Sequence, residues 1–562
     1  MRCSLLSLTL LAVLVLATPA RSAADAATLA NPILPGSYPD PSICYADGAW
    51  YIVNSSFEYF PGLPIHRSTD LVNWELIGHA LHREEQVTSA VNLVDVASDG
   101  GIHAPSIRCR NGRFYVITTN VYTPPEPGHP TEFVNFVVTA ENPAGPWTDP
   151  QVIDGAPGID PDLFFDGDGR VWYVGNRAPA DPAFEGEGEI WLQEIDPATW
   201  RLVGKRHALW RGACGGTWAE GPHIYKRDGR YYLLIAEGGT GLNHAVMIAV
   251  ADEITGPYLS NPRNPVLTSR HLAYDNWVNS TGHADLFELP DGRWYAVLLG
   301  IRSEIGLGST MGRETFIVPV EWEREPFEWK PVKLEWPVFS PRSGRVEKVY
   351  PAPFAAPMRR PPSAWTDGFD GSSLDLRWNF RRLPLPDSWS LTTRPGHLRL
   401  AAHAATVRER GRASLLGIRQ TATAFRFTTH MRFAPRSDGS EAGLILFQKD
   451  DRRVGFTVRR EGGRHMLRLE TATGAESAVE SARSVLGNYA GEIYLRAEWR
   501  EGEYVFGWSS LEDGAYRELA RLPGDTLVSE GYTGAYLGLY ATANGGRQDD
   551  HADFDWVRYQ PR

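Results

Sequence analysis

The chain has 562 residues and a formal net charge of -12, and its acidic and basic residues are interspersed without a basic run. Nucleic acids and anionic membranes are poor partners for such a surface, so a neutral ligand is favoured. A chain of this length predicts at least two domains, each with a core of its own.

The first 22 residues predict a signal peptide. Arg2 supplies a positive charge, residues 5–17 are apolar, and Ala20-Arg21-Ser22 offers a small-x-small cleavage site. The apolar run is shorter than a membrane span, although an uncleaved anchor is the alternative. We therefore expect export to the periplasm or the medium.

Three cysteines remain after that cleavage: Cys44, Cys109 and Cys214. An odd, sparse set is no disulfide framework, and none of them has zinc-ligand spacing. One disulfide bridge and buried free thiols both remain open.

Five segments share one pattern, at residues 39–56, 103–120, 159–176, 219–238 and 282–300. Each begins with a polar or small residue beside Pro or Ala, continues through an apolar pair into a turn, mostly Asp-Gly or Asn-Gly, and ends in a β-rich run. Each therefore predicts a β-hairpin. The repeats recur roughly every 60 residues, the length of one four-stranded blade with its loops. The pattern predicts a five-bladed β-propeller over residues 31–335, and a β-sandwich of repeated hairpins is the alternative.

The composition changes after the fifth repeat. Residues 336–364 are rich in proline and predict a stiff linker. Residues 365–562 contain short alternating strands with Gly-containing turns, which are typical of a β-sandwich. The sequence thus predicts an all-β chain of two domains.

Alignment of the five repeats places Asp40, Ala104, Asp160, Glu220 and His283 at one shared position, with a shift of one residue left open in the fourth repeat. The start of each innermost propeller strand points into the central channel, so three carboxylates and a histidine are expected to converge. Like charges held close together raise at least one pKa. Cleavage of a glycosidic bond needs this separation, because one carboxyl must be protonated and another ionised. The alternative for each acid is a structural role, such as an Asp that caps a turn before Pro.

Several motifs resemble those of family 43 glycoside hydrolases. They are YPDPS at residues 38–42, GID at 158–160, AEGPH at 219–223, GHA at 282–284 and GRET at 312–315. SFEYFPG at residues 56–62 matches more narrowly the β-xylosidase and α-L-arabinofuranosidase branch, in which a C-terminal β-sandwich of jelly-roll, concanavalin-like type follows the propeller. The resemblance covers nearly the whole mature chain.

The resemblance implies a role for each of the three acids. Asp40 would be the general base that activates water, Glu220 the general acid, and Asp160 the group that tunes and orients Glu220. The family acts with inversion, which requires no organic cofactor, and the resemblance allows a structural calcium ion.

The resemblance also implies contacts around the sugar. Arg313 would bind hydroxyl groups, Phe57 would form an apolar wall, and Tyr532 would close the pocket from the sandwich. The alternatives are a surface or Glu314-paired arginine at residue 313 and core packing of Phe57. His283 is the candidate metal or water ligand, with a core histidine as the alternative. His103 stands where better-known β-xylosidases have Trp, which weakens any assignment of xylose over arabinose.

The resulting expectation is an exo-acting xylan 1,4-β-xylosidase, a secreted enzyme of xylan degradation whose substrate is a small oligosaccharide. It is bifunctional if it also releases arabinose. The alternatives are an α-L-arabinofuranosidase acting on arabinoxylan, a carbohydrate-binding propeller without activity, and a retaining transferase. The sequence makes no prediction of the oligomeric state.

Overall fold

The computed structural model describes residues 27–213, 215–324, 334–354, 359, 364–474, 478–528, 531–547 and 550–562. The predicted signal peptide and Cys214 lie outside these residues. Within them the one helix is a short 3-10 turn, η1 (Glu84–Gln86), and the remaining elements are strands. No helix in this part of the chain has the length and apolar character needed to cross a membrane. The predicted all-β class is confirmed.

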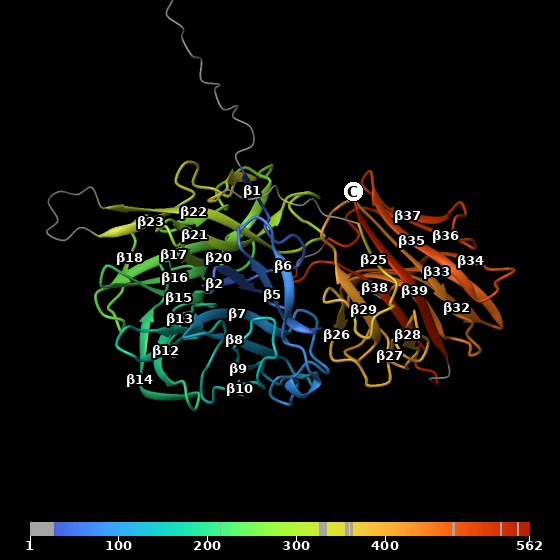
Figure 1. Cartoon of the computed structure of the whole chain (residues 1–562), viewed down its shortest axis with the longest axis horizontal. Coiled ribbons are helices and arrows are strands. Elements are labelled where there is room, and N and C mark those ends of the chain that lie inside the picture. The colour runs from blue at the N-terminus through green and yellow to red at the C-terminus, as the bar shows by residue number, and fades with distance from the viewer. Residues whose placement is uncertain are drawn as a thin grey trace, which may run out of the picture.

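Five antiparallel blades form the propeller, which occupies the blue-to-yellow half of Figure 1. The first blade contains β2 (Ser42–Ala46), β3 (Ala49–Val53), β5 (Gly62–Ser68) and β6 (Glu75–Leu81). The second contains β7 (Gly101–Arg110), β8 (Arg113–Tyr122), β9 (Glu132–Ala140) and β10 (Gln151–Val152). The third contains β11 (Asp162–Phe165), β12 (Val171–Arg177), β13 (Glu189–Asp196) and β14 (Arg201–Trp210).

The fourth blade contains β15 (Glu220–Arg227), β16 (Arg230–Glu237), β17 (Ala245–Ala251), β18 (Leu259–Ser260) and β19 (Leu267–Thr268). The fifth contains β20 (Val278–Glu288), β21 (Trp294–Arg302), β22 (Glu314–Arg324) and β23 (Glu335–Phe339). Residues 336–339, which fall in the predicted linker, thus belong to the outer strand of this blade. The first strands β2, β7, β11, β15 and β20 contact one another in turn, and β20 returns to β2. This ring of inner strands surrounds the propeller axis.

Tight turns join the first two strands of the blades, as the repeats predict. Asp47-Gly48, Asn111-Gly112 and Asp228-Gly229 each have two successive residues with positive φ. This is the geometry of a type I′ turn, whose twist matches that of the flanking strands.

A disulfide joins Cys44 on β2 to Cys109 on β7, so the first two blades are covalently linked. The sequence left this pairing open. Strand β1 (Thr28–Ala30) pairs with β24 (Val349–Pro351), which brings the start of the described chain to the segment that leaves the propeller.

Two sheets form the sandwich, in the orange-to-red half of Figure 1. One sheet has β27 (Trp389–Ser390), β28 (Leu398–Ala401), β39 (His551–Pro561), β30 (Phe425–Arg432), β35 (Glu492–Arg500), β36 (Glu503–Ser509) and β37 (Arg517–Pro523), with β25 (Trp365–Asp367) beside β39. The other has β34 (Val479–Val485), β33 (Arg464–Thr473), β32 (Arg452–Glu461), β31 (Glu441–Lys449), β38 (Tyr536–Thr542), β29 (Ser414–Arg419), β26 (Asn379–Arg381) and β4 (Tyr59–Phe60). Alternating apolar side chains of both sheets, such as Phe427 and Phe456, form one buried core.

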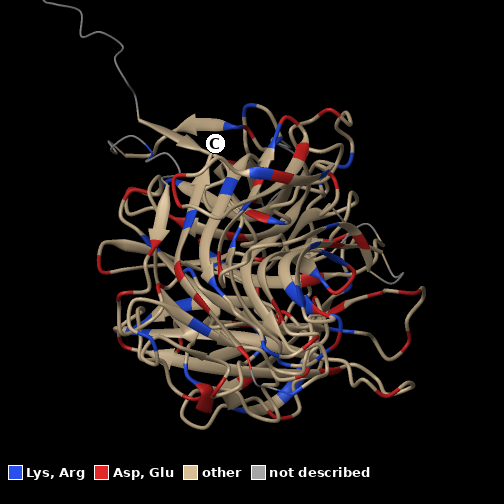
Figure 2. Ribbon diagram, turned by 90° about the vertical axis from the view of Figure 1, so that its right-hand side faces the viewer, with Lys and Arg blue, Asp and Glu red and all other residues tan. Residues whose placement is uncertain are grey.

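The two domains share a sheet, because β4 of the propeller is the edge strand beside β26 of the sandwich. The backbone N–H of Arg382 also donates to the carbonyl oxygen of Glu58 at 2.8 Å. The loop that contains Phe57 is therefore held by both domains. Acidic and basic residues are mixed over the whole ribbon in Figure 2, in keeping with the interspersed charge of the sequence.

Candidate active site

A cavity of about 370 Å³ opens at the propeller axis. All five residues of the shared repeat position line it: Asp40, Ala104, Asp160, Glu220 and His283. Four of these side chains carry ionisable groups, and all four are largely shielded from water. The convergence predicted from the repeat alignment is present in the structure.

A shared backbone conformation directs these side chains into the cavity. Asp40, Ala104, Asp160 and His283 all have a positive φ, between 26° and 55°. Asp40 and Asp160 stand just before β2 and β11, whereas Ala104 and His283 lie at a register shift within β7 and β20. In the fourth blade Gly221 has this conformation, with φ 57°, so Glu220 stands one residue before the position that Ala104 and His283 occupy. The same register shift occurs at this place in β7, β15 and β20. Non-glycine residues rarely adopt positive φ, and such strain persists where the surrounding structure enforces it, often at functional sites.

Asp40 is held as a carboxylate by its neighbours. Ser55 Oγ donates to Asp40 Oδ2 at 2.6 Å, and Arg313 Nη1 lies 3.4 Å from Asp40 Oδ1. Ser55 Oγ in turn accepts the backbone N–H of Ala104 at 2.7 Å. Burial raises the pKa of Asp40, but Arg313, His283 and Ser55 together lower it below its ordinary value.

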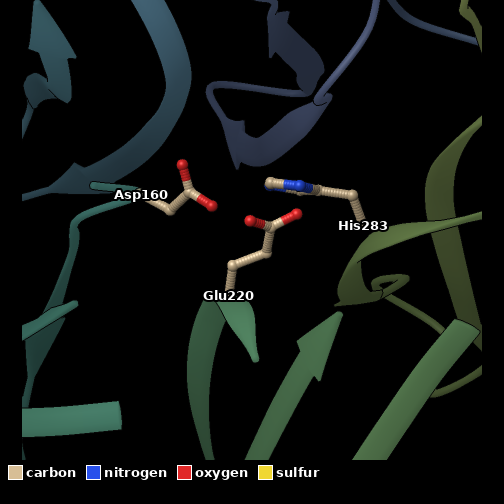
Figure 3. Close-up of side chains that lie close together, drawn as sticks. All are labelled: Asp160, Glu220 and His283. Atoms are coloured by element: carbon tan, nitrogen blue, oxygen red, sulfur yellow. The ribbon is translucent and has the colours of Figure 1, made fainter. Parts of the chain in front are cut away.

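Asp160 and Glu220 face each other across the cavity, and His283 reaches them from the other side (Figure 3). One ligand atom from each of the three lies within 4.8 Å of the others. Burial and the negative charge of Asp40 raise the pKa of Glu220 to about 7. Burial, Glu220 and Asp40 likewise raise the pKa of Asp160, although Gly221 N–H donates to its Oδ2 at 3.0 Å. Two carboxyl groups this close resist being ionised together near neutral pH.

Arg313, His103 and Tyr532 line one side of the cavity, and the predicted apolar wall residue Phe57 does not line it but packs against these three side chains. Arg313 lies with its Cζ 5.0 Å from the ring centre of Tyr532 and 5.7 Å from that of Phe57. The ring of Phe57 meets His103 edge to face at 5.0 Å, and His103 meets Tyr532 at 5.9 Å. Phe57 and Arg313 are buried, whereas Tyr532 is 40% exposed. The four predicted sugar-contact residues are thus side by side, and Tyr532 comes from the sandwich.

Asp99 also lines the cavity, and the sequence did not predict it. Its Oδ1 accepts the backbone N–H of Tyr532 at 3.0 Å, and its carbonyl oxygen lies 2.9 Å from His103 Nε2. Asp99 therefore fixes the positions of both the Tyr532 loop of the sandwich and the imidazole of His103. It precedes Gly100, and an Asp-Gly pair resembles an ordinary turn, so only its place between two motifs, SFEYFPG and IHAP, could have signalled it.

The cluster of Asp160, Glu220 and His283 is a poor calcium site. Calcium takes six to eight oxygen ligands, whereas this cluster offers two carboxylates and a ring nitrogen. Burial lowers the pKa of His283 to about 4, so the ring is neutral, and its Nδ1 lies 3.8 Å from Asp40 Oδ1. The donor set does not fit the calcium ion that the motif resemblance allowed.

Comparison with known proteins assigns both domains. Residues 29–326 match the family model described as glycosyl hydrolases family 43, and residues 366–560 match the beta-xylosidase C-terminal concanavalin A-like domain. A xylosidase/arabinosidase of Butyrivibrio fibrisolvens is 37% identical over 546 residues, which cover 94% of this chain and 98% of that protein. A non-reducing end alpha-L-arabinofuranosidase of Bacteroides ovatus is 36% identical over 540 residues, which cover 95% of both chains.

Solved structures similar to this chain also cover nearly its full length. A xylan beta-1,4-xylosidase from Bacillus halodurans has a TM-score of 0.85 at 31% sequence identity, over 95% of this chain and all of that chain. A GH43B protein of a Bacteroides ovatus xyloglucan locus has a TM-score of 0.84 at 34% identity, with the same coverage. The propeller and the sandwich occur together in these relatives.

Proposed function

The chain belongs to glycosyl hydrolase family 43, and we propose that its pocket releases single pentose units, chiefly xylose, from the non-reducing ends of xylo-oligosaccharides by one-step inversion. One observation carries this proposal. The same cavity holds Asp40, whose pKa is lowered, and Glu220, whose pKa is raised to about 7. These are the two protonation states that cleavage of a glycosidic bond requires.

Each carboxyl group has one task in this mechanism. Asp40 removes a proton from a water molecule that attacks the anomeric carbon, while Glu220 gives its proton to the leaving oxygen. As the water attacks, Arg313 balances the charge around Asp40 from 3.4 Å. In this mechanism Asp160 tunes Glu220, because two neighbouring carboxyl groups resist carrying two charges. Burial, Glu220 and Asp40 raise the pKa of Asp160 itself.

The rings of His103 and Tyr532 on one side of the cavity support exo action. Phe57 packs against both rings, with its centre 5.0 Å from His103 and 6.0 Å from Tyr532, and so supports this side from behind. A pocket covered on that side accepts the end of a chain more readily than its middle. Aromatic faces also suit the apolar face of a sugar ring.

Leaving-group dependence tests the assignment of Glu220. In E220Q, kcat/KM for xylobiose should fall by about 10²–10⁴, because the leaving oxygen receives no proton. A dinitrophenyl xyloside should lose far less, since dinitrophenolate leaves without protonation. D40N should lose activity on both substrates. D291N is the control, because Asp291 is a turn carboxylate outside the cavity, and it should keep its activity on both. Equal losses by E220Q on the two substrates would contradict the role of general acid.

The anomer of the first product tests inversion. One-step displacement on a β-xyloside yields α-xylose, which NMR resolves before the sugar mutarotates. A first product of β-xylose would point to a retaining route through a covalent intermediate.

Arabinofuranoside hydrolysis is the second candidate function, and His103 favours it. Burial lowers the pKa of His103 to about 4, so the ring is neutral, and its Nε2 donates to the carbonyl oxygen of Asp99. Its Nδ1 is then an acceptor that can take a hydrogen bond from a sugar hydroxyl. We expect H103W to lower kcat/KM for an aryl arabinofuranoside more than for the matching xyloside. An unchanged ratio of the two kcat/KM values would show that His103 does not select between the two sugars.

We also propose export, on the pattern of residues 1–22 alone. N-terminal sequencing of the mature protein tests it, and a start near Ala23 is the expected result.

A further inference from the structure

A second ring of side chains follows the acid cluster along each inner strand. Its members lie two residues after the residue with positive φ in each blade: Ser42, Ser106, Asp162, His223 and Asp285. Each is at most 3% exposed. The mechanism proposed above uses none of them.

Arg108, the next inward-facing residue of β7, places its guanidinium among these side chains. Nη1 donates to Asp285 Oδ2 at 2.9 Å and to Ser42 Oγ at 3.2 Å. Nη2 donates to Asp162 Oδ2 at 2.5 Å and lies 2.9 Å from His223 Nδ1. One cation therefore contacts residues of the first, third, fourth and fifth blades from its own position in the second.

The remaining polar atoms of the two carboxylates also have partners. Tyr225 Oη donates to Asp285 Oδ1 at 2.6 Å, and Ile43 N–H donates to Asp285 Oδ2 at 3.1 Å. Leu163 N–H donates to Asp162 Oδ1 at 2.7 Å. Both carboxylate side chains are only 1% exposed, so without Arg108 each would be a buried charge lacking its counter-ion.

Two buried carboxylates, an imidazole and a hydroxyl around one point on a propeller axis would otherwise suit a divalent cation. We propose that the Arg108 guanidinium is the built-in cation of this axis and holds the five inner strands together without a metal ion. Asp162 and Asp285 are two residues from Asp160 and His283, so the arginine ring supports the floor of the pocket. This inference rests on the proposed function only for its activity readout.

The wild-type protein provides the first test. After dialysis against EDTA, its melting temperature and its kcat/KM on an aryl xyloside should stay the same, and CaCl₂, MgCl₂ or MnCl₂ should change neither. A fall in melting temperature on chelation, reversed by one of these ions, would overturn the proposal whether or not the protein hydrolyses xylosides. If the protein proves inactive, the melting temperatures still decide the inference, and only the proposed function fails.

Removal of the guanidinium provides the second test. R108M should lower the melting temperature by roughly 5–10 °C, because two buried carboxylates lose their partner. CaCl₂ should then raise the melting temperature of R108M, but not that of the wild type or of R108M/D162N/D285N, which lacks the carboxylates. R170M is the matched control, since Arg170 pairs with Asp168 at a half-exposed turn, and its melting temperature should not change.

Two further outcomes are decisive. If R108M does not fold, R108K should still fold, with an intermediate melting temperature and no response to calcium, because lysine keeps the charge but cannot form the two-sided bridge. An R108M that melts with the wild type, or an R108K that is as unfolded as R108M, would overturn the proposal.

Discussion

The repulsion between Asp160 and Glu220 should be measurable as a shift in the pH profile of D160N. Their facing oxygens lie within 4.8 Å. Two unit charges at that distance, at an effective dielectric constant of about 20, repel by about 3.5 kcal/mol, or about 2.5 pKa units. Because the two carboxyl groups titrate as a coupled pair, only part of this repulsion changes the pKa of Glu220. We therefore expect D160N to lower the pKa of Glu220 by about one to two units.

The assay is kcat/KM on an aryl xyloside from about pH 4 to about pH 9, which reports the pKa values of the free enzyme. In the wild type, activity should fall as the pH rises through about 7, where Glu220 loses its proton. In D160N this basic limb should move to lower pH, and activity at neutral pH should fall with it. D166N is the control, since Asp166 pairs with Lys226 at a hairpin outside the cavity. A basic limb that stays in place, or moves to higher pH, would refute the reasoning.

Three further predictions follow from neighbouring contacts. R313M should raise the pKa of Asp40 and so move the acidic limb of the kcat/KM profile to higher pH. It should also raise KM. An acidic limb that does not move would show that Arg313 does not lower the pKa of Asp40. Y532A should raise KM about tenfold, equivalent to about 1.4 kcal/mol of lost binding, without a change in melting temperature, because the ring is 40% exposed. C44S/C109S should lose about 4 kcal/mol of stability, and dithiothreitol should lower the melting temperature of the wild type but not of this variant.

The parts of the site that the sequence predicted are those a repeat makes visible. Asp40, Asp160 and Glu220 lie about 60 to 180 residues apart, yet each stands at the same place in its own hairpin, to within one residue in the fourth repeat. Since every hairpin is the inner half of a blade, equal places in the repeat become neighbouring places around the axis. The turns were predictable for a similar reason, because Asp-Gly and Asn-Gly accept the backbone angles that short hairpins need.

The parts that the sequence did not predict depend on contacts between repeats or between domains. Arg108 looks like one of many arginines in a strand, and its role appears only when four other blades surround its side chain. Asp99 belongs to no repeat and acts on the sandwich through the backbone of Tyr532. The disulfide between Cys44 and Cys109 joins two blades whose packing has to be known before the pair can be chosen from three cysteines.

The common backbone of the five blades explains how one repeated unit supports several chemical roles. The same left-handed backbone conformation directs an acid from Asp40, an acid from Asp160 and an imidazole from His283 into one cavity. At Ala104 the same conformation presents only a methyl group, which leaves room for a sugar, while its N–H supports Ser55 and thereby Asp40. The strain is therefore a property of the repeat, and the side chain at that position decides whether a blade supplies an acid, a base or space.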